Sequence, residues 1–284
     1  MRRLSVAALV VASTITFSQM ASAAPPPPPW TGFYIGGNIG YSWGNADTDI
    51  TGSGTIKSFA FKNNFGFADS NTARLDGVIG GFQIGYNYQL NPNWVLGLVA
   101  DIQASGERGS NSFADTFSSS VCVTFQVQCL LTAPLNGNVA MNYEAKILWF
   151  GTARARVGYL IAPELLVYAT GGLAYGRVDV SGNVQVTATT PAAAASLSAF
   201  NTFGDSRVNF GFSVGGGIES SAWLPPNWTW GLEYLYLDLG SIDTTTSLSA
   251  SGAIPLPTSM NMTITTHTHF TDNIVRLVLN YRFP

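Results

Sequence analysis

The chain has 284 residues, a formal net charge of −3 and only 10% charged residues, whereas about 25% is usual for a soluble domain. So few charges cannot cover the surface of a large soluble domain. After the first 23 residues, no apolar run reaches the roughly 18 residues of a membrane-spanning helix. Basic patches typical of nucleic-acid binding are missing as well. The composition therefore argues against a soluble enzyme, a helical membrane protein and a nucleic-acid-binding protein.

The N-terminus has the features of a secretory signal peptide. An Arg-Arg pair precedes an apolar run, and the small residues Ala21-Ser22-Ala23 form a cleavage site. We expect residues 1–23 to be removed, an uncleaved membrane anchor being the alternative. Residues 24–29 are rich in proline, which predicts a stiff polyproline II tether in the periplasm.

Eight later segments alternate between apolar positions and polar or glycine positions, which is the period of a strand with two different faces. In the first segment, Phe33, Ile35 and Tyr41 share one face, while the other face is mostly glycine. The pattern leaves the facing of residues 165–180 undecided. The eight segments are residues 30–44, 78–88, 94–103, 143–159, 165–180, 207–219, 228–236 and 275–283.

The connections between these segments alternate in length. The long ones are rich in Ser, Thr, Gly and Asn, and tight turns lie between them. Outer-membrane barrels combine long extracellular loops, short periplasmic turns and an even number of strands. Residues 30–284 are therefore predicted to be all-β, forming an eight-stranded antiparallel transmembrane β-barrel in contact with outer-membrane lipid and lipopolysaccharide. The predicted extracellular loops are residues 47–73, 106–138, 181–206 and 241–270.

Three segments carry a resemblance to a known family. WTGFYIGGNIGYSWG at 30–44, GTARARVGYLIAPELLVYATGGLAYG at 151–176 and NIVRLVLNYRF at 273–283 are similar to the porin-like outer-membrane immunogenic proteins of alphaproteobacteria, members of the eight-stranded outer-membrane β-barrel family. With the strand layout between them, the resemblance covers essentially the whole mature chain. It implies a place in the bacterial outer membrane, and it says little about any activity. The chain departs from the family at Pro284, because the family usually ends on an aromatic residue.

The C-terminal segment carries an unbroken row of apolar side chains on one face. In the family that the chain resembles, such a strand is the signal read by the outer-membrane insertion machinery, and recognition by strand addition would suit it. We also expect this strand to pair with residues 33–43 and so close the barrel. The row consists of Val275, Leu277, Leu279, Tyr281 and Phe283.

Charged residues fall on the faces predicted to point into the barrel. Buried charges persist when they are paired and hydrogen-bonded, so these groups are predicted to form an ion-pair network that fills a narrow lumen. A thin path for solutes lined by the same groups is the alternative. The predicted lumen residues are Asp101, Glu144, Lys146, Arg154, Arg156, Glu219, Glu233 and Arg276, with Arg207 and Arg282 on the same faces.

The two histidines and the two cysteines lie in predicted loops. His267 and His269 could bind a metal or haem, but the sequence offers no third ligand, and we interpret them as solvated. Cys122 and Cys129 are separated by six residues. In an exported protein two nearby cysteines usually pair, so a disulfide within the second long loop is predicted, free thiols being the alternative.

Two functions follow from these features. The first is a structural, surface-exposed outer-membrane protein whose loops recognise external ligands, and the alternative is a narrow porin-like channel for small solutes. We predict no enzymatic activity, because no serine is tied to the two histidines by its spacing in the sequence. We also predict no cofactor, and the glycine clusters lack the sequence context of a phosphate-binding loop. The sequence leaves the oligomeric state open.

Overall fold

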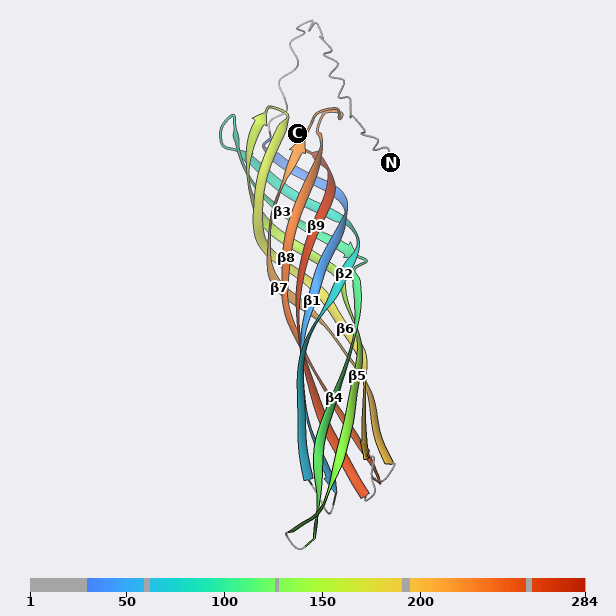
Figure 1. The fold of residues 1–284 in the computed structure, drawn as a ribbon. Coiled ribbons are helices and arrows are strands. Elements are labelled where there is room, and N and C mark those ends of the chain that lie inside the picture. Colours follow the sequence, from blue (N-terminus) through green and yellow to red (C-terminus); the bar gives the residue numbers. More distant parts are fainter. Residues whose placement is uncertain (1–29, 59–61, 126–127, 191–194, 254–256, 284) are drawn as a thin grey trace, which may run out of the picture.

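The computed structural model describes residues 30–58, 62–125, 128–190, 195–253 and 257–283, so the expected signal peptide and proline-rich tether lie outside it. The described residues form nine antiparallel strands and no helix long and apolar enough to cross a membrane (Figure 1). The strands are β1 (Gly32–Ser58), β2 (Lys62–Gln89), β3 (Trp94–Ser105), β4 (Arg108–Phe125), β5 (Gln128–Ala162), β6 (Leu165–Thr190), β7 (Ala195–Ser220), β8 (Trp228–Ala253) and β9 (Pro257–Arg282).

The nine strands occupy eight positions in a closed ring. β3 and β4 lie end to end and share one position in the ring, because each of them lies between β2 and β5. β9 pairs with β1 from Arg282↔Tyr34 to Thr258↔Ser58, which closes the ring. The predicted eight-stranded barrel and the predicted closing pair are therefore confirmed.

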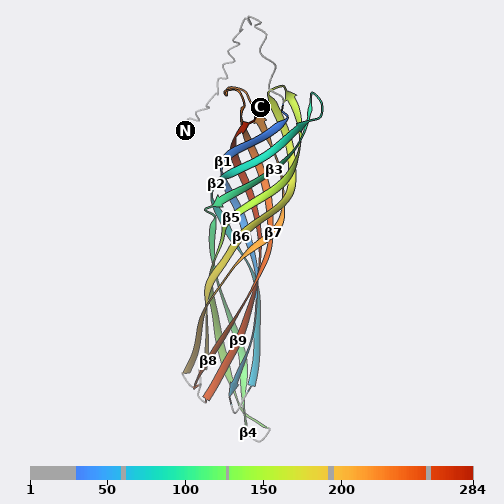
Figure 2. The same cartoon turned by 180° about the vertical axis from the view of Figure 1, so that it is seen from behind.

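In the half of the barrel near the termini, the tilted strands form a closed ring (Figure 2), with apolar side chains on its outer surface and polar ones in its interior. Outward side chains such as Phe82, Leu98 and Phe210 are 76%, 66% and 77% exposed, as expected for residues that face lipid. Aromatic pairs, including Trp94–Tyr159 and Trp228–Tyr281, lie close to the strand ends. Residues 165–180 are now placed, with even-numbered side chains such as Tyr168 and Thr170 pointing inward.

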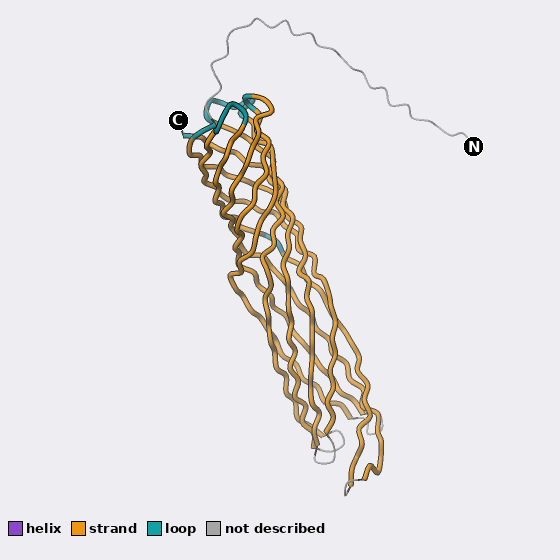
Figure 3. Tube along the Cα trace, turned by 90° about the vertical axis from the view of Figure 1, so that its left-hand side faces the viewer, coloured by secondary structure: helices purple, strands orange, loops and turns teal. Residues whose placement is uncertain are grey.

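The distal half corrects the prediction of long irregular loops. The segments expected as loops consist largely of strand, and β1 and β2 stay paired as far as Lys57↔Lys62 (Figure 3). Outward positions here carry Ser, Thr, Asn and Asp, whereas inward positions carry apolar side chains such as Ile50, Val184 and Ile264. The chemical pattern is therefore reversed relative to the half near the termini.

The distal half is built from two sheets that pack face to face. Within the described residues, the β7–β8 ladder ends at Phe212↔Asp238 and the β2–β4 ladder consists of Asp76↔Arg108 alone. These two interruptions separate β4–β5–β6–β7 from β8–β9–β1–β2. Inward side chains of both sheets form one apolar core, as in a β-sandwich. Stacked Phe65–Phe117 and Phe67–Phe113 rings, with centroids 4.6 and 5.7 Å apart, connect β2 and β4 across one interruption.

Local irregularities mark the level at which the barrel becomes a sandwich. The β8–β9 register shifts between Asp238 and Gly240, and the β5–β6 register shifts between Ile147 and Trp149. Gly240 has φ of +70°, a conformation that glycine tolerates best, and its N–H donates to Asp238 Oδ1 at 2.8 Å. Because a bulge bends its strand, β8 turns away from β7 at this point.

Glycines on the inner face of β1 leave room for long side chains on β9. A Cβ atom at Gly40 would lie 2.7 Å from the Cβ atom of Arg276, closer than real contacts. Gly37 points outward, and a Cβ atom there would meet nothing nearer than the Gly81 carbonyl oxygen at 3.9 Å. The alternation of aromatic and glycine positions in residues 30–44 therefore reflects lipid on one side and arginine on the other.

We predict that Gly40→Ala lowers the free energy of unfolding by about 1–3 kcal/mol, the usual effect of overpacking, while Gly37→Ala changes it little. The urea midpoint of each variant can be followed by the difference in gel mobility between unheated and boiled protein. Equal midpoints for the two variants would contradict the packing described for β1 and β9.

Candidate functional site

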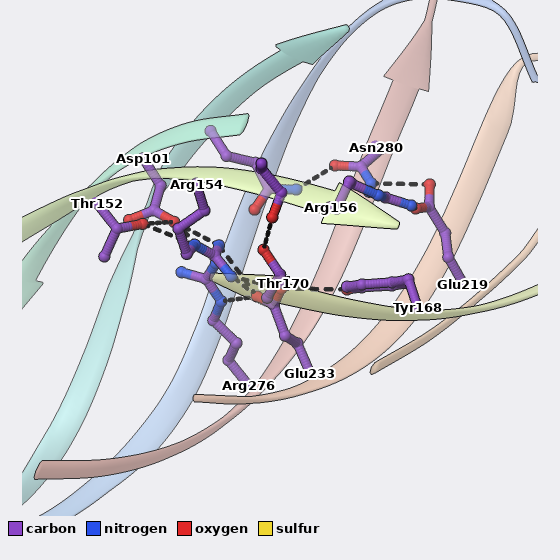
Figure 4. Close-up of polar contacts among 12 residues, drawn as sticks. Asp101, Thr152, Arg154, Arg156, Tyr168, Thr170, Glu219, Glu233, Arg276 and Asn280 are labelled. Carbon is purple, nitrogen blue, oxygen red and sulfur yellow. Dashed lines mark hydrogen bonds and ion pairs between the residues drawn. The ribbon is translucent and has the colours of Figure 1, made fainter. Parts of the chain in front are cut away.

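Four charged residues from opposite walls of the barrel meet at the centre of its lumen (Figure 4). Asp101 on β3 accepts hydrogen bonds from Arg154 on β5 at 2.8 Å and from Arg276 on β9 at 2.9 Å. Glu233 on β8 accepts from the same two guanidinium groups at 2.9 and 2.7 Å. All four side chains are at most 5% exposed. Two cations and two anions thus form a closed central cluster across the lumen.

A second buried pair lies beside the central cluster, towards the end with the termini. Arg156 donates to Glu219 at 2.7 Å, and its guanidinium lies over the Tyr168 ring, 4.1 Å from the centroid. Glu219 also accepts hydrogen bonds from Thr229 at 2.6 Å and Asn280 at 3.1 Å. Tyr168 donates to Glu233 at 3.2 Å and so connects the two groups. Together the six ionised side chains contain three positive and three negative charges, so their charges balance.

Trp30 covers the lumen at the end with the termini. Its side chain is 2% exposed, and its Nε1–H donates to the Pro163 carbonyl oxygen at 3.1 Å, in the turn between β5 and β6. The guanidinium of Arg282 lies 4.7 Å from the Trp30 ring centroid, within the range of a cation–π interaction. Nothing in the sequence pattern separated this tryptophan from the lipid-facing aromatics.

Two further carboxyl groups lie inside the barrel at the start of the distal half. Glu107 and Asp272 are 2% and 0% exposed, and Ser42 donates a short hydrogen bond to Asp272. Burial raises the pKa of Asp272 to about 6 and raises the pKa of Glu107 as well, because a low-dielectric site disfavours the charged form. Neither group is among the predicted lumen residues, because Glu107 lies in the predicted loop 106–138 and Asp272 lies just before the last predicted strand.

Two predicted lumen residues lie on the outer face instead. Glu144 and Lys146 pair with each other at 2.7 Å, with side chains 39% and 33% exposed. The prediction was wrong because the bulge at Leu148 shifts the register by one residue, and such a shift exchanges the two faces of a strand. Arg207 is also exposed and pairs with Asp205 at 2.8 Å.

The structure places the other predicted residues as follows. Val275, Leu277, Leu279 and Phe283 are outward and 38–57% exposed, and their part in assembly stays a prediction.

His267 and His269 are outward, with His267 Nδ1 2.6 Å from Asp243 Oδ1, and the described residues contain no group of three or more ligands suited to a metal. The side chains of Cys122 and Cys129 lie outside the described residues, so their disulfide stays a prediction.

A closed barrel with lipid-facing side chains outside and paired charges inside defines an integral outer-membrane protein. Residues 7–283 match the outer membrane protein beta-barrel domain family, and the chain belongs to this family. It is 36% identical to the 31 kDa outer-membrane immunogenic protein of Brucella melitensis over 211 residues, which cover 74% of this chain and 72% of that protein. It is 30% identical to the 22 kDa outer membrane protein of Rhizobium leguminosarum over 214 residues, or 75% and 66% of the two chains.

Solved structures with some likeness are also outer-membrane proteins. OprG from Pseudomonas aeruginosa is 14% identical, with a TM-score of 0.30, and the match covers 89% of this chain and 97% of OprG. The attachment invasion locus protein Ail of Yersinia pestis is 14% identical, with a TM-score of 0.25 and coverage of 82% and 98%. These scores are too low to carry an argument about function. By family, the protein resides in the bacterial outer membrane.

We predict that Arg156→Met destabilises the barrel by about 3–5 kcal/mol, because it leaves the buried Glu219 carboxylate without its cation. The double variant Arg156→Met with Glu219→Gln should recover most of that loss, since no uncompensated charge remains. Urea midpoints of the two single variants and the double variant measure this coupling. Additive losses would show that the two groups are not an isolated buried pair.

Proposed function

We propose that the protein is a non-conducting anchor in the outer membrane that holds an ordered β-sandwich above the cell surface for the recognition of external ligands. The observation that carries the proposal is the filled lumen. Arg154 and Arg276 are held between Asp101 and Glu233, and each of these four groups comes from a different strand. An eight-stranded barrel encloses only enough space for side chains, so a solute would have to separate these ion pairs.

The distal sandwich supports the recognition part of the proposal. Its two sheets share a packed apolar core, and interiors of this kind hold their surfaces in one arrangement. The outward side chains are mostly Ser, Thr, Asn and Asp, groups that can form hydrogen bonds with a ligand. The relative from Brucella melitensis is named an outer-membrane immunogenic protein, which agrees with a surface role. Asp101, Glu219 and Glu233 have a structural role in this account, since each is held by arginine.

The alternative is a narrow channel, and one observation favours it. Several buried polar atoms in the lumen have no hydrogen-bond partner among the described residues, including Asp101 Oδ1, Arg276 Nη1 and both side-chain polar atoms of Asn87. Such atoms are normally paired with protein or water, so water could occupy the space beside the ion pairs. A chain of water molecules would form a path much narrower than a porin channel.

Conductance across a planar bilayer separates the two functions. We expect the purified wild-type protein to give no unit conductance in salt solution. The charge-balanced variant Arg154→Ala with Glu233→Ala should also stay closed, because the Arg156–Glu219 pair, Trp30 and the apolar core of the distal half still block the path. Stepwise currents from the wild-type protein that increase in this variant would contradict the anchor and support the channel.

A further inference from the structure

Lysine and arginine are scarce in this chain, and outside the lumen they are concentrated at one height. Beyond residue 29 the sequence has eleven, of which Arg154, Arg156, Arg276 and Arg282 are buried in the barrel and Lys57 and Lys62 lie at the far end of the β1–β2 hairpin. The other five occupy five neighbouring positions, one on each of β2, β4, β5, β6 and β7. We call this set the basic collar: Arg74, Arg108, Lys146, Arg177 and Arg207.

The basic collar directly follows the apolar outer surface of the barrel. On β6 the outward residues Leu173 and Tyr175 are followed by exposed Arg177. On β7 Arg207 follows exposed Val208 but pairs with buried Val178, so it lies on the other face of the strand and reaches solvent with a side chain that is 57% exposed. On β5 exposed Leu148 is followed by outward Lys146. Because the apolar surface marks the depth of the lipid chains, the basic collar lies at the level of the polar groups of the outer leaflet.

Three arginines of the basic collar are available to an external anion. The described residues place no carboxylate within 4.0 Å of Arg74, Arg108 or Arg177, and Arg177 forms a side-chain hydrogen bond to the Ser206 hydroxyl at 2.9 Å. Lys146 and Arg207, in contrast, pair with Glu144 and Asp205. Arg108 stands between Lys146 in the β4–β5 ladder and Asp76 on β2, and its guanidinium forms no ion pair within 4.0 Å with Asp76.

The opposite side of the molecule differs in charge at the same height. There β8, β9 and β1 carry His267 and His269 together with outward carboxylates, and in their described residues no lysine or arginine faces outward at this level. The carboxylates are Asp47, Asp49, Asp238 and Asp243. The basic collar therefore covers one side of the barrel and does not reflect a general excess of positive charge.

We propose that Arg74, Arg108 and Arg177 bind the phosphate groups of a phosphorylated glycolipid in the outer leaflet. Guanidinium groups form paired, charge-assisted hydrogen bonds with phosphate, and basic residues at a membrane surface attract anionic headgroups. Asp76 and Asp179 lie among the cations. Asp76 accepts a hydrogen bond from the Tyr41 hydroxyl at 2.6 Å, so its charge is partly satisfied. This inference does not depend on whether the lumen conducts.

The test is a titration of the full-length protein in detergent with fluorescent lipid A that carries both phosphates, followed by anisotropy. We expect the triple variant R74Q/R108Q/R177Q to bind at least roughly tenfold more weakly than the wild type, the effect of one lost charge-assisted hydrogen bond or more. The matched control is K57Q/K62Q, which removes cations at the far end of a hairpin and should bind like the wild type. The difference in gel mobility between unheated and boiled protein checks that each variant is folded.

Two further binding measurements test whether the ligand is the phosphorylated lipid or phosphate alone. Lipid A freed of its phosphates should bind like the triple variant, and millimolar inorganic phosphate should not displace intact lipid A. If the triple variant does not fold, R74K/R108K/R177K keeps the charges but loses the guanidinium geometry, and it should bind more weakly than the wild type. Unchanged binding by the folded triple variant, an equal loss in the K57Q/K62Q control, equal binding of phosphate-free lipid, or displacement by inorganic phosphate would overturn the proposal.

Discussion

Each of the eight strand positions in this protein passes from lipid into water, and the need to suit both surroundings determines the rest of the structure. On β9 the outward residues Leu277 and Leu279 give way to Thr265 and Thr263, while the inward residues change from Arg276 to Ile264. Neither face alone is apolar throughout. Lipid requires an apolar exterior with every backbone group paired, whereas a fold surrounded by water requires an apolar interior.

The two halves meet these requirements with different architectures. In the membrane the ring is closed, because an unpaired strand edge cannot face lipid, and the small lumen is filled by balanced arginines and carboxylates. Outside the membrane the backbone ladders are interrupted between β7 and β8 and between β2 and β4. Asparagine side chains, such as Asn209 and Asn111, donate to backbone carbonyl oxygens across these interruptions. Two sheets can then approach closely enough to bury Ile50, Phe113 and Ile264 in a common core. The bulges at Leu148 and Gly240 lie at this transition.

Sequence periodicity predicted the parts of the fold in which the strands follow a simple alternation. It identified the barrel, the glycine-rich inner face of the first strand and, together with the family resemblance, the pairing of the C-terminal strand with β1. It failed at Leu148, because a bulge exchanges the faces of a strand without changing the composition, and so Glu144 and Lys146 were assigned to the lumen. It also treated Ser- and Thr-rich hairpins as loops, since polar outward residues hid the apolar inward ones. The contact of Trp30 with Arg282 depends on the closed ring, which no local pattern contains.

The reversal of the two faces can be tested by labelling single cysteines on intact cells with a water-soluble maleimide, in a chain with Cys122→Ser and Cys129→Ser. Three positions are chosen. Met262 points into the core of the sandwich, Thr263 points outward into water, and Leu277 points outward into lipid. The structure predicts rapid labelling of Thr263→Cys and strong protection of both Met262→Cys and Leu277→Cys. Equal labelling at the adjacent positions 262 and 263 would show that the distal segments are irregular loops and would contradict the two-sheet architecture.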